Sequence, residues 1–207
     1  LQMMNLAISP VESFAYTVVK RTFDVLSASL GLILLSPLLC AIAALVKFSS
    51  PGAVLFRQER IGRHGKPFTL LKFRTMHCSS KTESDTLWTT RNDPRCTVLG
   101  AVLRRFSLDE LPQLFNVVRG DMSLVGPRPE RPYYVAKFGE DFQKYNMRHR
   151  CHVGMTGWAQ VNGLRGDTSI SDRLQYDLYY MRNWSFGMDL QIIFRTAFVA
   201  LTGTNEY

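Results

Sequence analysis

Cysteine is scarce in this sequence, and the cysteines it has follow no ligand pattern. Cys40, Cys78, Cys96 and Cys151 form no Cys-x-x-Cys pair, and no histidine lies at a zinc-ligand spacing from them. Structural zinc sites and disulfide frameworks both have characteristic spacings. We therefore expect neither, and the scattered thiols indicate a reducing compartment.

Low-complexity segments, internal repeats and an excess of flexible residues are also missing. The chain has 14 glycines and 9 prolines among 207 residues, whereas 46% of its residues are hydrophobic. This composition excludes disordered and collagen-like chains. The length predicts one well-buried domain.

Acidic residues are in short supply, with 17 against 25 lysines and arginines, which gives a net charge of +8. Such an excess suits nucleic acid, a phosphorylated substrate or an anionic membrane surface. Between residues 20 and 74 only Asp24 and Glu59 oppose nine basic residues: Lys20, Arg21, Lys47, Arg57, Arg60, Arg63, Lys66, Lys72 and Arg74. Almost the whole excess therefore flanks one apolar segment.

That segment, residues 25–46, carries no charge at all. As one helix it would be about 33 Å long, enough for a hydrocarbon core of about 30 Å. Pro37 at its centre has no N–H for the carbonyl of Ile33, and basic residues flank both sides, whereas a single span leaves one flank poorer in them. We therefore predict a re-entrant membrane helix over residues 20–48 that bends at Ser36-Pro37 and returns to the cytoplasmic face. The Ser36 hydroxyl or a neighbouring segment would bind the freed carbonyl.

A secretory signal peptide is the main alternative, because Ala41-Ile42-Ala43 resembles a cleavage site. The basic residues downstream oppose translocation, so we favour the re-entrant helix. The predicted organisation is an N-terminal tail or linker over residues 1–19, the re-entrant helix over 20–48 and a cytoplasmic domain over 49–207.

The remaining chain predicts a single small domain of helix-dominated, mixed α/β class. Short β-type runs at 53–56 and 68–73 predict a hairpin or two edge strands. Residues 188–201 are apolar enough to pack on the core or lie in the membrane interface. Apolar spacing predicts helices at 98–106, 110–118, 133–148 and 171–183, and loops are expected at 77–96 and 120–132.

Asp109 and Glu110 are adjacent carboxylates in Arg-Arg-Phe-Ser-Leu-Asp-Glu-Leu-Pro, residues 104–112. Pro112 favours a helix with Asp109 as its N-cap, because a missing N–H costs nothing in the first turn. Both carboxylates would then lie at a positive helix end beside arginines, which favours their ionised forms. Ionised carboxylates can attack phosphorus or hold Mg²⁺, and an ordinary acidic helix start fits equally.

Arg128 stands between Pro127 and Pro129, which restrict its backbone and present its guanidinium with little freedom. Such a rigid fork suits a phosphate, although a plain rigid turn explains the tetrapeptide as well. Lys72 and Arg74 would share one strand face, which is either a solvated edge or a phosphate-binding face.

Residues 154–163 are expected to form a glycine-punctuated loop with one aromatic residue and two amides, which suits a base or a sugar and equally a packed turn. The histidines follow no partner pattern, so we expect solvated or structural roles for them: His64, His77, His149 and His152.

Taken in order, these motifs resemble the bacterial sugar transferase family, the monotopic polyprenyl-phosphate phosphoglycosyl transferases. The resemblance covers about residues 20–207 and is strongest to the undecaprenyl-phosphate glucose and galactose phosphotransferases of exopolysaccharide synthesis. It departs at residues 151–153, Cys-His-Val, where the family commonly has Val-Lys. It rests on Lys-Arg before the Ser-Pro helix and on Lys-Phe-Arg-Thr-Met (72–76), Arg-Arg-x-Ser-Leu-Asp-Glu-Leu-Pro-Gln (104–113), Gly-Asp-Met-Ser-Leu-Val-Gly-Pro-Arg-Pro-Glu (120–130), Gly-Trp-Ala-Gln-Val-Asn-Gly (157–163) and Tyr-Asp-Leu-Tyr-Tyr (176–180).

Long members of that family carry further N-terminal transmembrane helices and an additional domain. The sequence begins with Leu1 rather than Met. We therefore expect either a part of a longer chain or an alternative start codon that has been read as Leu.

The resemblance implies transfer of a hexose-1-phosphate from UDP-glucose or UDP-galactose to undecaprenyl phosphate, with release of UMP, at the cytoplasmic face of the bacterial inner membrane. It implies Asp109 as the nucleophile, with Glu110 and Asp109 holding Mg²⁺. Membrane lipids are expected partners, a homodimer is allowed and no nucleic acid is expected. The residues implied to bind or support the substrate are Lys72, Arg104, Arg128 and Asp177.

Two other functions remain open. A membrane-anchored basic module that binds anionic lipid or nucleic acid would explain the charge but not the carboxylate pair or the Pro-Arg-Pro loop. A membrane phosphatase that acts through an aspartyl-phosphate would release inorganic phosphate instead of UMP.

Overall fold

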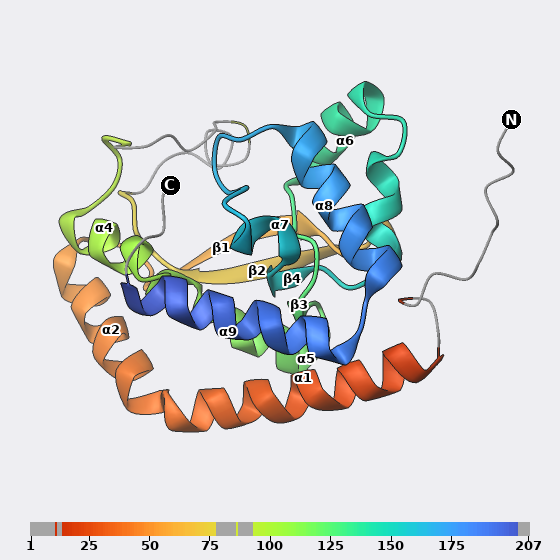
Figure 1. Cartoon of the computed structure of the whole chain (residues 1–207). Coiled ribbons are helices and arrows are strands. Elements are labelled where there is room, and N and C mark those ends of the chain that lie inside the picture. Colours follow the sequence, from red (N-terminus) through yellow and green to blue (C-terminus); the bar gives the residue numbers. More distant parts are fainter. Residues whose placement is uncertain (1–10, 12–13, 78–85, 87–92, 203–207) are drawn as a thin grey trace, which may run out of the picture.

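The charge-free segment forms the second half of one helix and most of the next. The computed structural model describes residue 11, residues 14–77, residue 86 and residues 93–202. In it, α1 (Phe14–Leu34) runs along the bottom edge of Figure 1 and meets α2 (Ser36–Ser49) at an angle of 64°. No single helix in these ranges is long and apolar enough to cross a membrane, whereas this bent pair passes the same criterion jointly.

The bend has the cause that the sequence predicts. Pro37 lies in the first turn of α2, and the Ser36 hydroxyl donates to the Ile33 carbonyl over 2.8 Å. That carbonyl is the one that would receive the N–H that proline lacks. The predicted bend at Ser36-Pro37 is confirmed.

A two-stranded hairpin crosses the middle of the molecule (Figure 1). Strand β1 (Leu55–Ile61) is antiparallel to β2 (Pro67–Phe73), with Leu55 opposite Phe73. The 3-10 turn η2 (Arg63–Gly65) connects the strands. The predicted hairpin is confirmed, with its first strand shifted toward the C-terminus.

The helix-dominated, mixed α/β class is also confirmed. The other helices are α4 (Val98–Arg105), α5 (Gln113–Arg119), α6 (Pro132–Asp141), α7 (Trp158–Val161), α8 (Ile170–Asn183) and α9 (Phe186–Thr202), with 3-10 turns η3 (Leu108–Glu110) and η4 (Tyr145–Arg150). The single helix predicted at 133–148 is wrong, because α6 ends at Asp141 and η4 follows separately. Most of the loop predicted at 77–96 lies outside the described residues.

A second, parallel strand pair was not predicted. Strand β3 (Ser123–Val125) pairs with β4 (Gly154–Thr156), in two stretches that the sequence assigned to loops. The backbones meet so closely that a Cβ on Gly154 would lie 2.1 Å from the Gly126 nitrogen. A Cβ on Gly157 would lie 2.3 Å from the Gly126 oxygen. Only glycine fits at these contacts.

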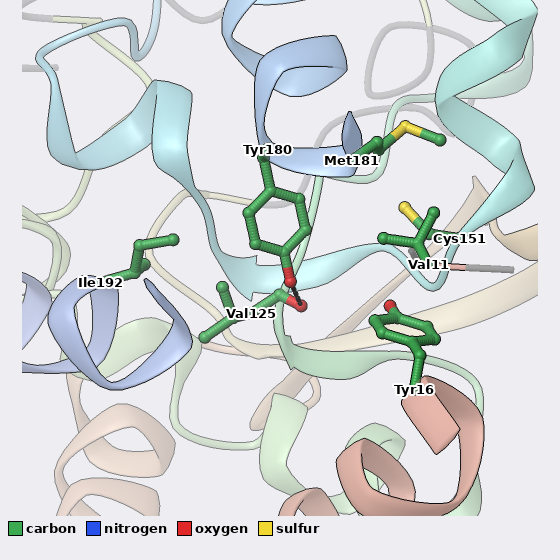
Figure 2. Packing of buried hydrophobic residues seen from close by; sticks show 7 residues of the cluster. All are labelled: Val11, Tyr16, Val125, Cys151, Tyr180, Met181 and Ile192. Atoms are coloured by element: carbon green, nitrogen blue, oxygen red, sulfur yellow. Dashed lines mark hydrogen bonds between the residues drawn. The ribbon is translucent and has the colours of Figure 1, made fainter. Parts of the chain in front are cut away.

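The core joins elements from both ends of the chain. Figure 2 shows Tyr16 from α1, Val125 from β3, and Tyr180 from α8, whose hydroxyl oxygen lies 3.3 Å from the Val125 carbonyl oxygen. Cys151 and Ile192 complete the same cluster. The N-terminal half of α1 therefore packs as part of the folded domain.

Much of the apolar surface stays exposed. Large side chains on α1, α2 and α9 have no cover: Leu26, Leu30, Ile33, Leu34, Leu45, Phe48, Phe194, Phe198 and Leu201. Large apolar side chains exposed in such numbers are typical of a contact with a membrane or a partner.

Two basic residues that the sequence analysis counted as a flank of the membrane segment are engaged inside the protein. Lys20 is 3% exposed, and its ammonium lies 2.7 Å from Asp189 on α9. Arg21 donates to the carbonyls of Val117 and Val118 at the end of α5. These charges therefore fasten α1 to the domain instead of facing lipid headgroups.

Candidate active site

Asp109 and Glu110 lie in the 3-10 turn η3, between α4 and α5. Ser107 adopts a left-handed backbone with φ of 55°, and the Glu110 N–H bonds to the Ser107 carbonyl. The prediction that Asp109 is an N-cap is wrong, because the 3-10 turn occupies 108–110 and α5 begins only after Pro112. The turn buries both acidic side chains.

Glu110 is held by two cations from other segments. The Lys72 ammonium at the end of β2 lies 2.6 Å from Glu110 Oε1, and the Arg128 guanidinium lies 3.0 Å from the same oxygen. Burial alone would raise the pKa of Glu110, but Lys72 and Arg128 together outweigh it and hold the pKa below its ordinary value. Glu110 is therefore a stable carboxylate at neutral pH.

Asp109 has a different environment from its neighbour. Its side chain is buried, and its Oδ1 has no hydrogen-bond partner among the described residues. Burial raises the pKa of Asp109, the Lys72 ammonium opposes this, and the Glu110 charge adds to it. A buried carboxylate oxygen without a partner is costly in a purely structural residue and is suited to a bond with an incoming group.

Arg104 lies at the edge of this group. Its Nε donates to the Thr75 hydroxyl over 2.9 Å, and its charge lowers the pKa of Asp109. Arg74, which the sequence placed beside Lys72, is not part of the site. Its guanidinium donates to the carbonyls of Val46 and Ser50 and so caps the end of α2. Lys72 therefore belongs to the site, whereas Arg74 caps the end of α2.

Arg128 projects from a loop whose backbone is held on several sides. The Pro127 carbonyl accepts from the Gly154 N–H, the Arg128 carbonyl from Arg148, and the Pro129 carbonyl from Arg60. The prolines alone led us to expect a pre-aimed guanidinium, and these contacts add to that restriction.

Asp177 on α8 is in a buried ion pair. Its carboxylate lies 2.8 Å from the Arg148 guanidinium, and burial raises its pKa although Arg148 acts in the opposite direction. Asp177, Arg148 and Arg128 line one small cavity together with Gln160 and Tyr145. Asp177 is therefore connected to the site indirectly, by its ion pair with Arg148 and by the cavity that both residues line with Arg128.

Arg148 and Arg60 were missed by the sequence analysis. Arg148 stands in the run Arg-His-Arg at 148–150, and Arg60 is one of many basic residues in its region. Neither has a local pattern that reveals its contact with a distant carbonyl.

The residues present fit a magnesium ion held jointly with substrate. No group of three or more His, Cys, Asp or Glu side chains suited to a metal occurs among the described residues. Mg²⁺ typically binds one or two carboxylates and completes its shell with water and substrate phosphates. Asp109, with its unpartnered oxygen, and Glu110 supply that pair.

The residues that depart from the family pattern lie away from this pair. Cys151 is in the core cluster, and burial raises its pKa to about 12. His152 lies 3.3 Å from Arg63, and burial lowers its pKa to about 4, as it does for His149. The structural role predicted for these two histidines agrees with their positions.

Comparison with known proteins connects this geometry to named relatives. A profile of the family described as bacterial sugar transferase matches residues 15–203. The UDP-glucose:undecaprenyl-phosphate glucose-1-phosphate transferase of Escherichia coli (strain K12) is 46% identical over 194 residues, which cover 91% of this chain and 41% of that protein. The protein of the same name from Caulobacter vibrioides is 44% identical over 96% of this chain and 75% of its own length.

A shorter relative matches nearly from end to end. The exopolysaccharide production protein PSS of Rhizobium leguminosarum bv. phaseoli is 44% identical over 89% of this chain and 96% of its own length. The chain thus spans less than half of the Escherichia coli protein and nearly the whole of the Rhizobium one.

Proposed function

Because the chain belongs to the bacterial sugar transferase family, we propose that it transfers a hexose-1-phosphate from a UDP-sugar to undecaprenyl phosphate and releases UMP. The observation that carries the proposal is the buried pair in η3. Glu110 is neutralised by Lys72 and Arg128, while Asp109 beside it keeps an unpartnered oxygen. One carboxylate is thereby fixed, and the other is available for a bond.

Two displacements at phosphorus account for the reaction. The Asp109 carboxylate attacks the sugar-bearing phosphorus, the bond to the bridging oxygen breaks, and UMP leaves with that electron pair. A phosphate oxygen of undecaprenyl phosphate then attacks the same phosphorus, which frees the Asp109 carboxylate and gives undecaprenyl-diphosphate-sugar. This covalent route lets one nucleophile serve two substrates of different polarity in turn.

The cations around the pair prepare the site for a diphosphate. Lys72, Arg104 and Arg128 offset phosphate charge, so an anionic nucleophile can approach an anionic substrate. Mg²⁺, held by Asp109 and Glu110, would supply further charge neutralisation at the leaving phosphate. Asp177 supports the site through its pair with Arg148.

We also propose that α1 and α2 form a re-entrant anchor at the cytoplasmic face of the inner membrane, with residues 49–207 as the cytoplasmic domain. Both ends of the bent pair are tied to one folded body. Lys20 near the start of α1 binds Asp189, and Arg74 binds the last carbonyls of α2. A bilayer cannot separate two ends that attach to the same domain.

Cysteine labelling in sealed vesicles tests this anchor. Single cysteines at positions 17 and 52 should react from the same face. Reaction from opposite faces would refute the re-entrant arrangement.

The relatives' names favour UDP-glucose as the first donor to test. UDP-galactose is tested beside it because the motifs also resemble galactose phosphotransferases. In the decisive experiment, protein and UDP-sugar are mixed without a lipid acceptor, and UMP and intact mass are measured. We expect up to one equivalent of UMP and a phosphosugar adduct on the peptide around Asp109.

Other outcomes separate the alternatives. Turnover with both substrates but no adduct would indicate direct attack by the lipid phosphate. Release of inorganic phosphate would indicate a phosphatase, and salt-dependent lipid binding without turnover would indicate a basic membrane module.

A further inference from the structure

The loop that carries Arg128 has three successive carbonyls bound by three different elements. The Gly154 N–H of β4 donates to Pro127 over 2.9 Å, and the Arg60 guanidinium of β1 donates to Pro129 over 3.0 Å. Between them, Arg148 Nη2 donates to the carbonyl of Arg128 itself over 2.8 Å. The contact at the central residue therefore comes from a side chain on η4.

Both terminal nitrogens of the Arg148 guanidinium are in turn engaged. Nη2 carries two N–H bonds, and its second acceptor is the Asp177 carboxylate at 2.8 Å. Nη1 donates to the Tyr145 hydroxyl over 2.7 Å, and the guanidinium lies over the Tyr145 ring. The side chains of Arg148 and Asp177 are 7% and 4% exposed, so this pair is shielded from competing water.

The same backbone unit connects this pair to the carboxylates. The Arg128 carbonyl is held by Arg148, and the Arg128 side chain, 29% exposed, reaches Glu110 at 3.0 Å. A rotation of that peptide would move the guanidinium away from Glu110 and from any phosphate beside it. Two prolines restrict φ at their own positions and the conformation of Arg128, but they leave the orientation of the loop on the domain to its contacts.

We propose that Arg148, oriented by Asp177, is a positioning residue that sets the direction of the Arg128 guanidinium for phosphate stabilisation. The kinetic consequence of this inference rests on the proposed function. Asp177 then acts on the substrate indirectly, through Arg148 and Arg128, and no contact between Asp177 and the substrate is required.

The test is a double-mutant cycle that removes the buried pair without leaving a lone charge. Arg148→Met with Asp177→Leu replaces both charges by apolar groups, which buried ion pairs commonly tolerate. We expect the thermal unfolding midpoint to stay close to that of the parent. We expect kcat for UMP release with both substrates to fall about a hundredfold, a scale that small misplacements of a stabilising group produce.

Arg128→Ala is then made in both backgrounds. If Arg148 acts through Arg128, the substitution should cost kcat much less in the Arg148→Met/Asp177→Leu protein than in the parent, by about tenfold or more. Losses that simply multiply would overturn the proposal. Lys20→Met, which breaks a buried ion pair elsewhere, is the control, and its loss should multiply with that of Arg128→Ala.

A second measurement needs no activity. Hydrogen–deuterium exchange of the peptide that carries residues 126–131 should accelerate in Arg148→Met/Asp177→Leu, and the peptide over α9 should not change. Arg148→Lys should also show faster exchange, because one ammonium cannot serve the separate acceptors that Nη1 and Nη2 reach. Unchanged exchange would refute the positioning role of Arg148, whether or not the protein releases UMP. Absence of UMP release from the parent protein would refute the proposed function and leave the exchange test valid.

Discussion

The protein contains two clusters in which carboxylates pair with basic residues. One cluster fastens α1 to the domain, and the other lies at the active-site turn η3. The Asp189 cluster joins Lys20, Asp24 and Asp189, and the Asp109 cluster joins Lys72, Asp109, Glu110 and Arg128. Both combine two buried carboxylates with basic residues, one in the Asp189 cluster and two in the Asp109 cluster. They differ in how completely the carboxylate oxygens are bound.

In the Asp189 cluster every carboxylate oxygen has a donor. Asp189 accepts from the Tyr180 hydroxyl on one oxygen and from Lys20 on the other. Asp24 accepts from the Ser123 hydroxyl and from the Leu124 N–H. In the Asp109 cluster both cations converge on one oxygen of Glu110, while Asp109 Oδ1 stays without a partner in the described chain. Complete satisfaction indicates a structural role, and the unbound oxygen indicates chemistry.

The largest expected effect is on Asp109→Asn. An amide is a poor nucleophile, so UMP release without acceptor should vanish and turnover should fall on the order of 10³-fold or more. Folding should be unharmed, because the variant no longer buries a charge. Thermal unfolding checks the stability of the variant, and the UMP assay checks its loss of activity. The matched change Asp189→Asn should do the reverse, lowering stability while folded protein keeps the acceptor-independent UMP release.

Lys20→Met tests the structural half of the comparison. It leaves Asp24 and Asp189 buried without their cation, and removing one partner of a buried pair typically costs about 3–5 kcal/mol. We expect the unfolding midpoint to drop by roughly 10 °C for a domain of this size. Lys72→Met should cost clearly less, since Arg128 still binds Glu110. Equal losses in the two variants would contradict the distinction.

The pH dependence of activity comes next in size. Asp109 must be ionised to attack, and burial raises its pKa, so the acid limb of kcat should lie above the ordinary range of an aspartate. Lys72 is the largest charge that opposes this rise, so Lys72→Met should move the limb to still higher pH. The exposed Lys66→Met serves as a control with an unmoved limb. Steady-state rates of UMP release from pH 4 to 9 measure these limbs.

Stability should follow the same signs. The folded-state pKa of Asp109 is raised, so its ionisation costs stability at neutral pH, and this cost disappears as the pH falls. The folded-state pKa of Glu110 is depressed, so its contribution is full above its unfolded value and is lost as the pH falls toward the depressed one. Any stability advantage of Asp109→Asn over the parent should therefore shrink in acid, as denaturant unfolding at several pH values would record. A constant advantage would contradict the raised pKa of Asp109.

The smallest effect distinguishes two hydroxyls on the bent pair. Ser36→Ala removes the donor to the Ile33 carbonyl at the proline bend and should cost up to about 1 kcal/mol. Ser49→Ala removes a donor to the Val46 carbonyl, which Arg74 still binds, and should cost less. Unfolding midpoints in detergent compare them. A larger loss for Ser49→Ala would count against the role of Ser36 at the bend.

The features that the sequence predicted correctly depend on neighbours along the chain. The bend follows from Ser36-Pro37, because the proline cannot donate an N–H to the Ile33 carbonyl. The adjacency of Asp109 and Glu110 needs no folding at all. The unequal treatment of the two carboxylates, however, depends on Lys72 and Arg128, which arrive from distant segments.

The features that were missed depend on long-range pairing. Strands β3 and β4 are too short for an alternating pattern, so only their mutual contact defines them. Lys20 has the position of a membrane flank, and only the placement of Asp189 reveals its ion pair. Asp109 was expected at a helix N-cap because the local pattern could not anticipate the 3-10 turn that delays α5.

The glycine contacts between β3 and β4 limit how this protein can diverge or be recombined. The Pro-Arg-Pro loop starts at Gly126, and Gly154 and Gly157 belong to the other glycine-rich motif, yet their backbones touch where no Cβ fits. A side chain at any of the three would push the two motifs apart. Chimeras that exchange one motif between relatives should therefore keep all three glycines, and the two loops are best exchanged together as one unit.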